Sequence, residues 1–327
     1  MSEAGVRSWP VPPWTQEPRA QLQAAHRSGR LPHALLIHEA AGAGGEWLAY
    51  WCAQLVLCEH AERAPCGTCT GCRRVLSRAH PDLLCIAPEE DSRQIRIEAV
   101  RELAAELALT SHGGGYKVGV LVPADALNRF AANALLKTLE EPPARTLLVL
   151  VATQPSRLPP TILSRCQRLR LRAPSRAAAL AWLGAARAAD HPWEPVLDEL
   201  GNAPFVAAAA EPEAVAAAAR ESRADLKELS AGSADPPATA ERWARTELPL
   251  RLQCFENWLT ERILGMEREG ALMAEVRAGP YLSSRAPVLN IRGLFRLLDA
   301  VRELRATLDV PLNRGVALED LFRRLAP

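Results

Sequence analysis

Four cysteines between residues 58 and 72 have the spacing of a metal site. Cys58, Cys66, Cys69 and Cys72 are separated by seven, two and two residues. In a reducing compartment such clustered cysteines are poor candidates for disulfides, whereas four thiolates can converge tetrahedrally on Zn²⁺. We therefore predict one structural zinc ion per chain, held by a module that spans residues 58–79.

Two other ligand schemes fit the cysteine run less well. A bacterial iron–sulfur pattern needs a further cysteine and a proline after Cys72, where Leu76 and Ser77 stand instead. If Cys58 lies away from the other three, a histidine is the expected fourth ligand. The candidates for that role are His60 and His80.

A glycine-rich turn at residues 39–46 is laid out like a phosphate-binding loop without its charged parts. In a working loop, backbone N–H groups wrap the phosphates, a lysine reaches the terminal phosphates and a Ser or Thr hydroxyl holds magnesium. Glu39 replaces the first glycine of that pattern, Gly45 stands at the lysine position and Glu46 at the hydroxyl position. Taken alone, the motif is better explained as an ordinary turn between a strand and a helix.

The next strand also lacks the acids of a nucleotide site. A P-loop ATPase needs carboxylates at the end of this strand to hold magnesium. Here the apolar run 118–122 ends at Val122, Pro123 follows it, and only a displaced Asp125 remains. Asp125 is expected at a turn or a helix start. The degenerate loop is consequently predicted to bind no ATP, with its remnant residues being Gly42, Gly44, Gly45 and Glu46.

One arginine side chain is a candidate for binding the phosphate groups of another molecule. Arg165 lies between Ser164 and Cys166, and a rigidly held arginine can donate a planar fork of hydrogen bonds to γ-phosphate oxygens. As an isolated residue, an exposed arginine is more often solvated or in a surface ion pair.

The elements around these residues indicate an α/β domain followed by an all-helical region. Apolar strand patterns alternate with helical patterns over about the first 170 residues, which predicts a parallel sheet with helices on both faces. We expect strands at 31–38, 82–86, 117–122 and 146–151, and helices at 16–27, 97–109 and 130–141. Asn128 is expected to cap the last of these helices. Beyond Pro174 only helical patterns occur, at 175–189, 192–200, 212–229, 238–269 and 290–308, with a linker at 231–237.

Composition sets the broad class. The chain has 327 residues, enough for two or three domains, and its 39 basic and 38 acidic residues give a net charge of +1. That balance provides no global attraction to nucleic acid or to an anionic membrane. The first 18 residues contain no continuous apolar segment, so a cytoplasmic protein is expected.

Three segments together resemble the bacterial clamp-loader family of AAA+ proteins. They are residues 31–36 at the entry to the glycine loop, 133–143 in a long signature helix, and 158–166 around Arg165. The resemblance covers about the first 170 residues, with the motifs in order. It implies an AAA+-like α/β domain at 1–172 with the zinc module 58–79 inserted, a helical lid domain at 173–212, and an all-α collar or oligomerisation domain at 213–327.

The resemblance also implies a function. Gly45 and Glu46, with Val122 and Pro123, match a zinc-bearing member of that family whose nucleotide site is dead. Such a subunit is expected to have no ATPase activity of its own and to supply Arg165 in trans as an arginine finger to a neighbouring gamma or tau ATPase. The implied partners are gamma or tau and delta subunits and, through the complex, the beta sliding clamp and primed DNA, within the DNA polymerase III holoenzyme, a nucleotidyltransferase.

Two alternatives remain open on the sequence. The chain could be a clamp-loader-type ATPase that hydrolyses ATP with an unusual loop, although two cation-handling sites would need replacement. It could also be a zinc-module nucleic-acid binder, against which the near-neutral charge argues.

Overall fold

The computed structural model describes residues 9–89, 92, 94–187, 191–276, 291–308 and 313–326. The chain divides into two compact units, which are Met1–Ala188 with Ala203–Phe205 and Ala189–Asn202 with Val206–Pro327. The three-part division at residues 172 and 212 stays a prediction.

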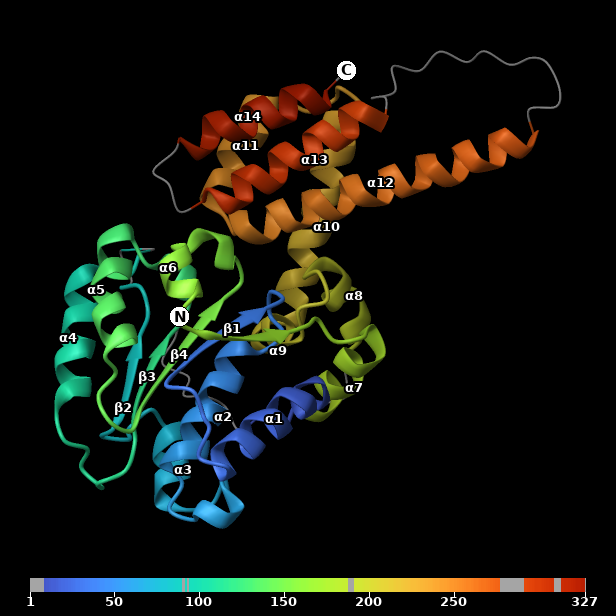
Figure 1. The fold of residues 1–327 in the computed structure, drawn as a ribbon. Coiled ribbons are helices and arrows are strands. Elements are labelled where there is room, and N and C mark those ends of the chain that lie inside the picture. Colours follow the sequence, from blue (N-terminus) through green and yellow to red (C-terminus); the bar gives the residue numbers. More distant parts are fainter. Residues whose placement is uncertain are drawn as a thin grey trace. The chain divides into compact units, whose positions relative to one another are not determined.

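A five-stranded parallel sheet forms the centre of the first unit (Figure 1). Its strand order is β2-β3-β4-β1-β5. The strands are β1 (Ala34–Glu39), β2 (Leu83–Ile86), β3 (Lys117–Leu121), β4 (Thr146–Ala152) and β5 (Gln167–Leu171). Every pairing is parallel, so the carboxyl ends of the strands share one edge of the sheet. The predicted parallel α/β domain is therefore confirmed.

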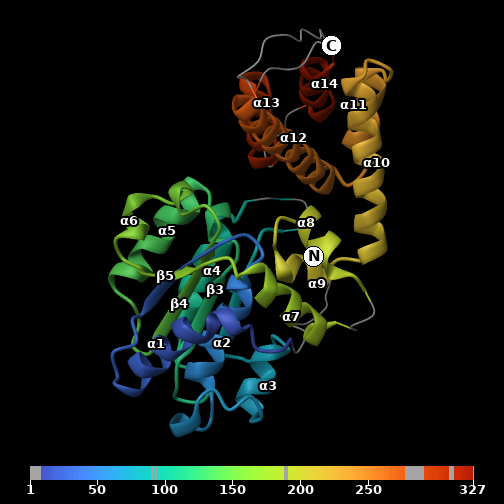
Figure 2. The ribbon, with the colours of Figure 1, turned by 90° about the vertical axis from the view of Figure 1, so that its right-hand side faces the viewer.

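Helices cover both faces of this sheet, because successive strand residues point to opposite sides. On one side Leu35 and Ile37 pack with α1 (Gln16–Arg27), α2 (Gly45–Leu57) and α3 (Thr70–Leu76). On the other side Leu36 packs with α4 (Ile97–Ala108), α5 (Arg129–Glu140) and α6 (Pro160–Leu163). Figure 2 shows the same arrangement after a quarter turn. Strand β4 is buried along its whole length, which explains its unbroken apolar run.

Local signals set several of these boundaries. Asn128 caps α5 as predicted, its side-chain oxygen accepting a 2.8 Å hydrogen bond from the N–H of Ala131. Short 3₁₀ turns join the elements at Pro13–Thr15, Ala61–Arg63, Ala124–Ala126 and Pro155–Arg157. Helix α7 (Arg176–Ala186) follows β5 in the same unit and is capped by Ser175.

The second unit is helical in its described residues. It contains α8 (Trp193–Glu199), α10 (Pro212–Ser230), α11 (Pro236–Arg245), α12 (Leu248–Val276), α13 (Ile291–Ala306) and α14 (Arg314–Leu325), and α9 (Pro204–Ala209) begins at the unit boundary. Its core centres on Trp243, Phe255 and Phe322, whose rings lie 5.0–6.2 Å apart. The predicted all-helical C-terminal region is therefore confirmed.

Two boundaries differ from the sequence prediction. The helix expected at 238–269 is two helices, α11 and α12, separated at Thr246 and Glu247. The expected linker 231–237 is shorter, since Asp235 caps α11 and the helix begins at Pro236. Among the helices in the described ranges, none combines the length and apolar character needed to cross a membrane.

Candidate metal centre and phosphate-loop remnant

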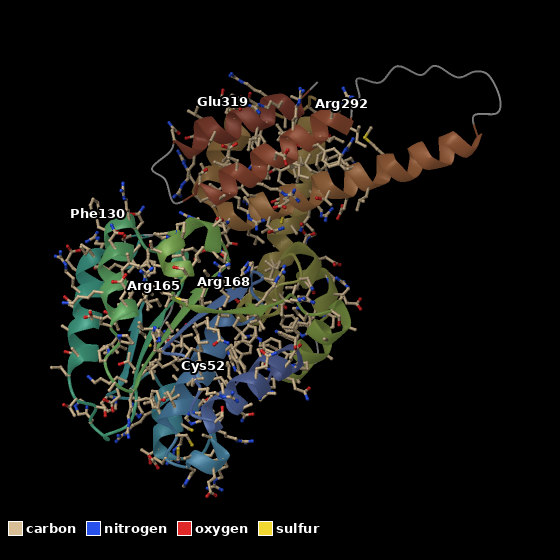
Figure 3. The ribbon with its side chains drawn as sticks, viewed as in Figure 1. Cys52, Phe130, Arg165, Arg168, Arg292 and Glu319 are labelled. Atoms are coloured by element: carbon tan, nitrogen blue, oxygen red, sulfur yellow. The ribbon has the colours of Figure 1, made fainter. Side chains whose placement is uncertain are left out.

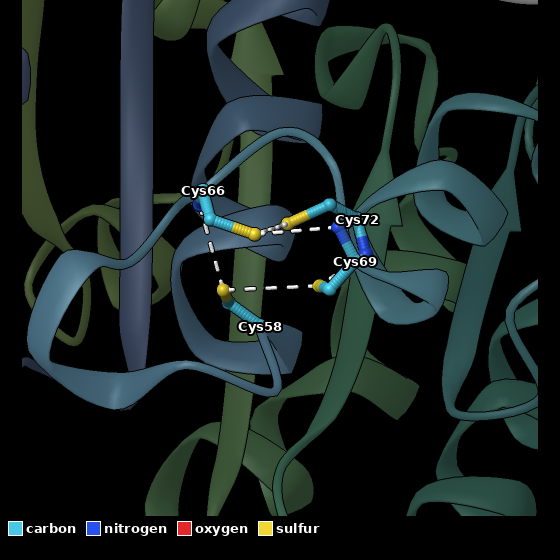
Figure 4. Close-up of side chains that lie close together, drawn as sticks. All are labelled: Cys58, Cys66, Cys69 and Cys72. Carbon is cyan, nitrogen blue, oxygen red and sulfur yellow. Dashed lines mark hydrogen bonds between the residues drawn. The ribbon is translucent and has the colours of Figure 1, made fainter.

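The structure brings the four predicted cysteine ligands together at the end of α2 (Figure 4). All four sulfur atoms lie within 4.8 Å of one another. The Sγ atoms of Cys58 and Cys69 are 3.9 Å apart, and those of Cys66 and Cys72 are 4.0 Å apart. Tetrahedral Zn–S bonds of about 2.3 Å would place sulfurs roughly 3.8 Å from one another.

Backbone N–H groups point at the sulfurs and favour thiolates. The N–H of Cys69 lies 3.3 Å from Cys66 Sγ, and the N–H of Cys72 lies 3.3 Å from Cys69 Sγ. The N–H groups of Thr68 and Cys69 lower the pKa of Cys66 to about 5, whereas burial raises the pKa values of Cys58 and Cys72. A bound cation would balance the charge of thiolates held this close. The four residues therefore fit a tetrahedral metal site.

The reserve ligands lie outside this site. Within the described ranges, the group of possible ligand atoms contains the four cysteines and neither histidine. His80 uses Nδ1 to accept a 3.1 Å hydrogen bond from the N–H of Asp82. His60 contributes its backbone, whose N–H lies 3.4 Å from Cys58 Sγ. The other cysteines are Cys52, Cys85, Cys166 and Cys254, which stand apart from this group.

The glycine-rich turn is occupied by the chain's own groups. Helix α2 begins at Gly45, and its N-cap Gly44 has a left-handed backbone with φ of 94°. Glu39, the last residue of β1, reaches back so that its Oε2 accepts a 2.6 Å hydrogen bond from the N–H of Gly45. In a working loop the N-terminus of this helix faces a phosphate. Here a carboxyl group takes that position.

The Glu39 carboxyl is held in an unusual electrostatic setting. Burial raises its pKa, nearby Glu46 and Asp125 raise it further, and the N–H groups of Gly45 and Gly44 oppose the shift. Glu46, at the hydroxyl position of the pattern, is paired with Arg78 at 2.6 Å. Sequence inspection identified Glu39 and Glu46 as departures from the pattern but gave no sign of these contacts.

Aromatic side chains cover the turn. Trp14 donates its indole N–H to the carbonyl of Ala43 at 2.8 Å, and the N–H of Phe205 donates to the carbonyl of Gly42 at 3.1 Å. The Phe205 ring packs so closely that a Cβ on Gly44 would lie 2.3 Å from its Cε2. Two more rings, those of Trp9 and Trp182, pack against the Phe205 ring. The sequence carried no local signal for this cluster, because its members come from distant segments.

The displaced acid near the strand end has a structural role. Asp125 is buried, and its Oδ2 accepts hydrogen bonds from Thr153 Oγ1 at 3.1 Å and from the N–H of Gln154 at 2.8 Å. These bonds join the turn after β3 to the end of β4. The carboxylate therefore stabilises the fold through these hydrogen bonds. Asp125 lies in a turn, as the sequence predicted.

Arg165 lies just after α6 with its guanidinium group partly exposed (Figure 3). Its Nη2 is 2.6 Å from Glu140 Oε1, and its Nη1 donates to the carbonyl of Thr161 at 3.0 Å. The signature helix and the arginine segment, which are separate motifs in the sequence, thus meet in the fold. Helix α6, which Arg165 follows, and helix α3, which contains Cys72, lie in different parts of this unit (Figure 1).

Comparisons with known proteins place the chain in a family. The family model described as "DNA polymerase III, delta subunit" matches residues 14–175. The DNA polymerase III subunit delta' of Pseudomonas aeruginosa is 37% identical over 325 residues, which is 95% of this chain and 95% of that protein. The DNA polymerase III subunit tau of Salmonella typhimurium is 37% identical over 146 residues, 44% of this chain and 22% of that protein. A gamma subunit-related protein from Thermotoga maritima has a solved structure with a TM-score of 0.48 and 18% identity, covering 93% of this chain and 97% of that one. Because the match to the Pseudomonas protein runs through almost the whole of both chains, the chain belongs to the family of DNA polymerase III delta' subunits.

Proposed function

We propose that this chain is a non-catalytic subunit of the clamp loader of DNA polymerase III. In that complex it binds gamma or tau and delta subunits and supplies Arg165 in trans to the ATP site of a neighbouring gamma or tau subunit. The complex places the beta sliding clamp on primed DNA. Membership of the delta' family and the similarity to a tau subunit support this assignment.

The observation that carries the proposal is the occupied glycine turn. A triphosphate needs free N–H groups, a lysine and a magnesium site. Here the N–H of Gly45 is bonded to Glu39, and the chain has no lysine at this position. Asp125, the nearest acid to the end of β3, is bonded to Thr153 and Gln154. A chain built in this way acts on a companion's nucleotide rather than on its own.

The exposure of Arg165 supports the finger role. Its side chain is 35% exposed, and Thr161 and Glu140 hold it from the protein side. An arginine whose guanidinium group is held on one side by the protein and is partly exposed to solvent can donate its remaining N–H groups to phosphate oxygens of an approaching subunit, where it stabilises charge that develops during hydrolysis.

The cysteine cluster is proposed to hold a structural zinc ion. Four thiolate ligands leave no open position for substrate, so the ion acts by holding the module in shape. Cys58 directly follows α2 and Cys72 lies in α3. Gln54 of α2 donates a 3.1 Å hydrogen bond to the carbonyl of Cys72, which ties the module to the main helix layer.

Reconstitution of the complex tests the finger. With Arg165→Ala, the complex is expected to assemble normally while ATP turnover at the neighbouring site falls by about 10³-fold or more. Arg168→Ala is the matched control, since Arg168 is an exposed arginine on β5 of the same unit. Turnover unchanged by Arg165→Ala, or reduced equally by both variants, would refute the finger role.

Nucleotide binding by the isolated chain separates this proposal from the alternative of an intrinsic ATPase. Calorimetric titration with Mg-ATP is expected to show no saturable binding, and the purified chain is expected to release no phosphate from ATP. Tight binding or turnover would establish the chain as an ATPase in its own right. Steeply salt-dependent DNA binding by the monomer would instead favour a nucleic-acid-binding module.

A further inference from the structure

Glu140 ends the signature helix α5 beside the guanidinium group of Arg165. Oε1 of Glu140 lies 2.6 Å from Nη2 of Arg165. On the neighbouring nitrogen, Nη1 donates to the carbonyl of Thr161 at 3.0 Å and lies 3.4 Å from Ser164 Oγ. The guanidinium is thus held from two directions, by the last residue of α5 and by the end of α6.

These contacts leave donors available. A guanidinium group carries five N–H donors in a fixed planar fork. Glu140 takes one N–H of Nη2, and the Thr161 carbonyl and Ser164 Oγ take those of Nη1, which leaves the Nε–H and one N–H of Nη2 for another acceptor. The ion pair therefore fixes the orientation of the guanidinium group and leaves some of its N–H donors for another acceptor.

We propose that Glu140 is a positioning residue for Arg165, a role that rests on the proposed trans action of this arginine. An unheld arginine side chain samples many rotamers, and that freedom is lost when it must meet a phosphate. Because Glu140 limits this freedom before the subunits meet, less entropy is lost in the transition state. The acid at the end of the signature helix would then serve the catalytic step of the neighbouring subunit.

The adjacent glutamate provides a matched control. Glu141 follows Glu140 directly and is also exposed, but its backbone leaves the helical conformation, with φ of −125°. Its backbone N–H donates a hydrogen bond to the carbonyl of Lys137. Replacing either acid by glutamine removes the same charge from the same corner of the domain, so a general charge effect would appear in both variants.

The test uses the reconstituted complex with the full chain carrying Glu140→Gln, Glu141→Gln, Arg165→Ala, or Glu140→Gln with Arg165→Ala. The Arg165-dependent turnover is the rate of the unsubstituted complex minus that of the Arg165→Ala complex. Glu140→Gln is expected to lower the kcat of this Arg165-dependent turnover by about two- to fivefold. The KM for ATP is expected to stay unchanged, because the arginine acts on the transition state. Glu141→Gln is expected to match the unsubstituted complex. Thermal unfolding and gel filtration verify that each variant folds and assembles.

The double variant separates the two proposals. If Glu140 acts through Arg165, the double variant turns over ATP at the rate of Arg165→Ala alone. A further loss in the double variant, an equal loss with Glu141→Gln, or a faster rate with Glu140→Gln would overturn the positioning role while leaving the finger intact. No effect of Arg165→Ala would instead overturn the finger role itself.

Discussion

The Oε2 atom of Glu39 lies 2.6 Å from the backbone nitrogen of Gly45, so an acid from the end of β1 satisfies the first turn of α2. This contact joins two departures from the phosphate-loop pattern, one at its first glycine and one at its lysine position. The two changes are linked physically, because a side chain at position 45 would crowd the carboxyl group of Glu39. A Cβ on Gly45 would lie 2.7 Å from Glu39 Cδ and 2.6 Å from Val151 Cγ1.

That crowding predicts a coupled pair of substitutions. Gly45→Ala is expected to destabilise the protein by about 1–3 kcal/mol, because the added methyl group overpacks the turn. In a Glu39→Ala background the cost of Gly45→Ala is expected to be smaller, since only the contact with Val151 remains. Urea unfolding of the four proteins gives this coupling energy. Equal costs in both backgrounds would show that Glu39 does not crowd the site.

The environment of Glu39 predicts a pH dependence. Its pKa lies above the ordinary value of 4.5, mainly through burial, so the folded chain holds this proton more tightly than the unfolded chain does. The resulting stabilisation is complete below about pH 4.5 and is lost as the pH rises through the folded-state pKa. Glu39→Gln is therefore expected to lose less unfolding free energy between pH 4.5 and 7 than the parent protein. Denaturant titrations across this range provide the measurement, with the exposed Glu141→Gln as control.

Metal analysis tests the cysteine cluster directly. One zinc ion per chain is expected in protein purified without chelator, and the combined change Cys66→Ser with Cys69→Ser should abolish it and lower the midpoint of unfolding, because zinc binding contributes to folding. Cys85→Ser, which changes an exposed cysteine outside the cluster, should retain the metal. A metal-free parent protein would eliminate the zinc assignment.

Substitution of Asp125 tests whether this acid stabilises the fold or takes part in ATP turnover. Asp125→Asn is expected to destabilise the fold by about 1–3 kcal/mol, because its buried carboxylate loses part of its bonding to Thr153 and Gln154. ATP turnover by the assembled complex is expected to stay the same, since the Asp125 carboxylate is bonded to Thr153 and Gln154 of its own chain. A large loss of turnover without a loss of stability would show that Asp125 serves a nucleotide after all.

The sequence predicted most of the sheet domain, because its signals are local. The strand at 146–151 was evident from an unbroken apolar run, and Asn128 identified the start of α5. β5 was missed because only two of its five residues, Leu169 and Leu171, are apolar, a weak pattern at a sheet edge. The sequence prediction joined α11 and α12 into one helix, although Pro249 indicates a new helix start, since proline is favoured in the first turn of a helix.

The sequence predicted which residues form the candidate sites, but it did not predict the contacts that these residues make. Cysteine spacing alone identified all four members of the cysteine cluster, since short spacings constrain the geometry. The pairing of Glu39 with Gly45 depends on how a side chain folds back across a turn, which no periodicity records. The meeting of Arg165 with Glu140 depends on the packing of α6 against α5, and the sequence gives the two residues no shared pattern.

The aromatic cover gives this protein an intrinsic optical reporter. Trp182 lies with its ring centre 5.5 Å from that of Trp9 and 5.6 Å from that of Trp14, and its indole N–H donates to the carbonyl of Pro10. Indole rings this close couple electronically, so their circular dichroism and fluorescence depend on their mutual geometry. Lifting the N-terminal segment from the glycine turn would change that spectrum without any added label, and spectroscopy could follow whether the turn stays covered in the proposed complex.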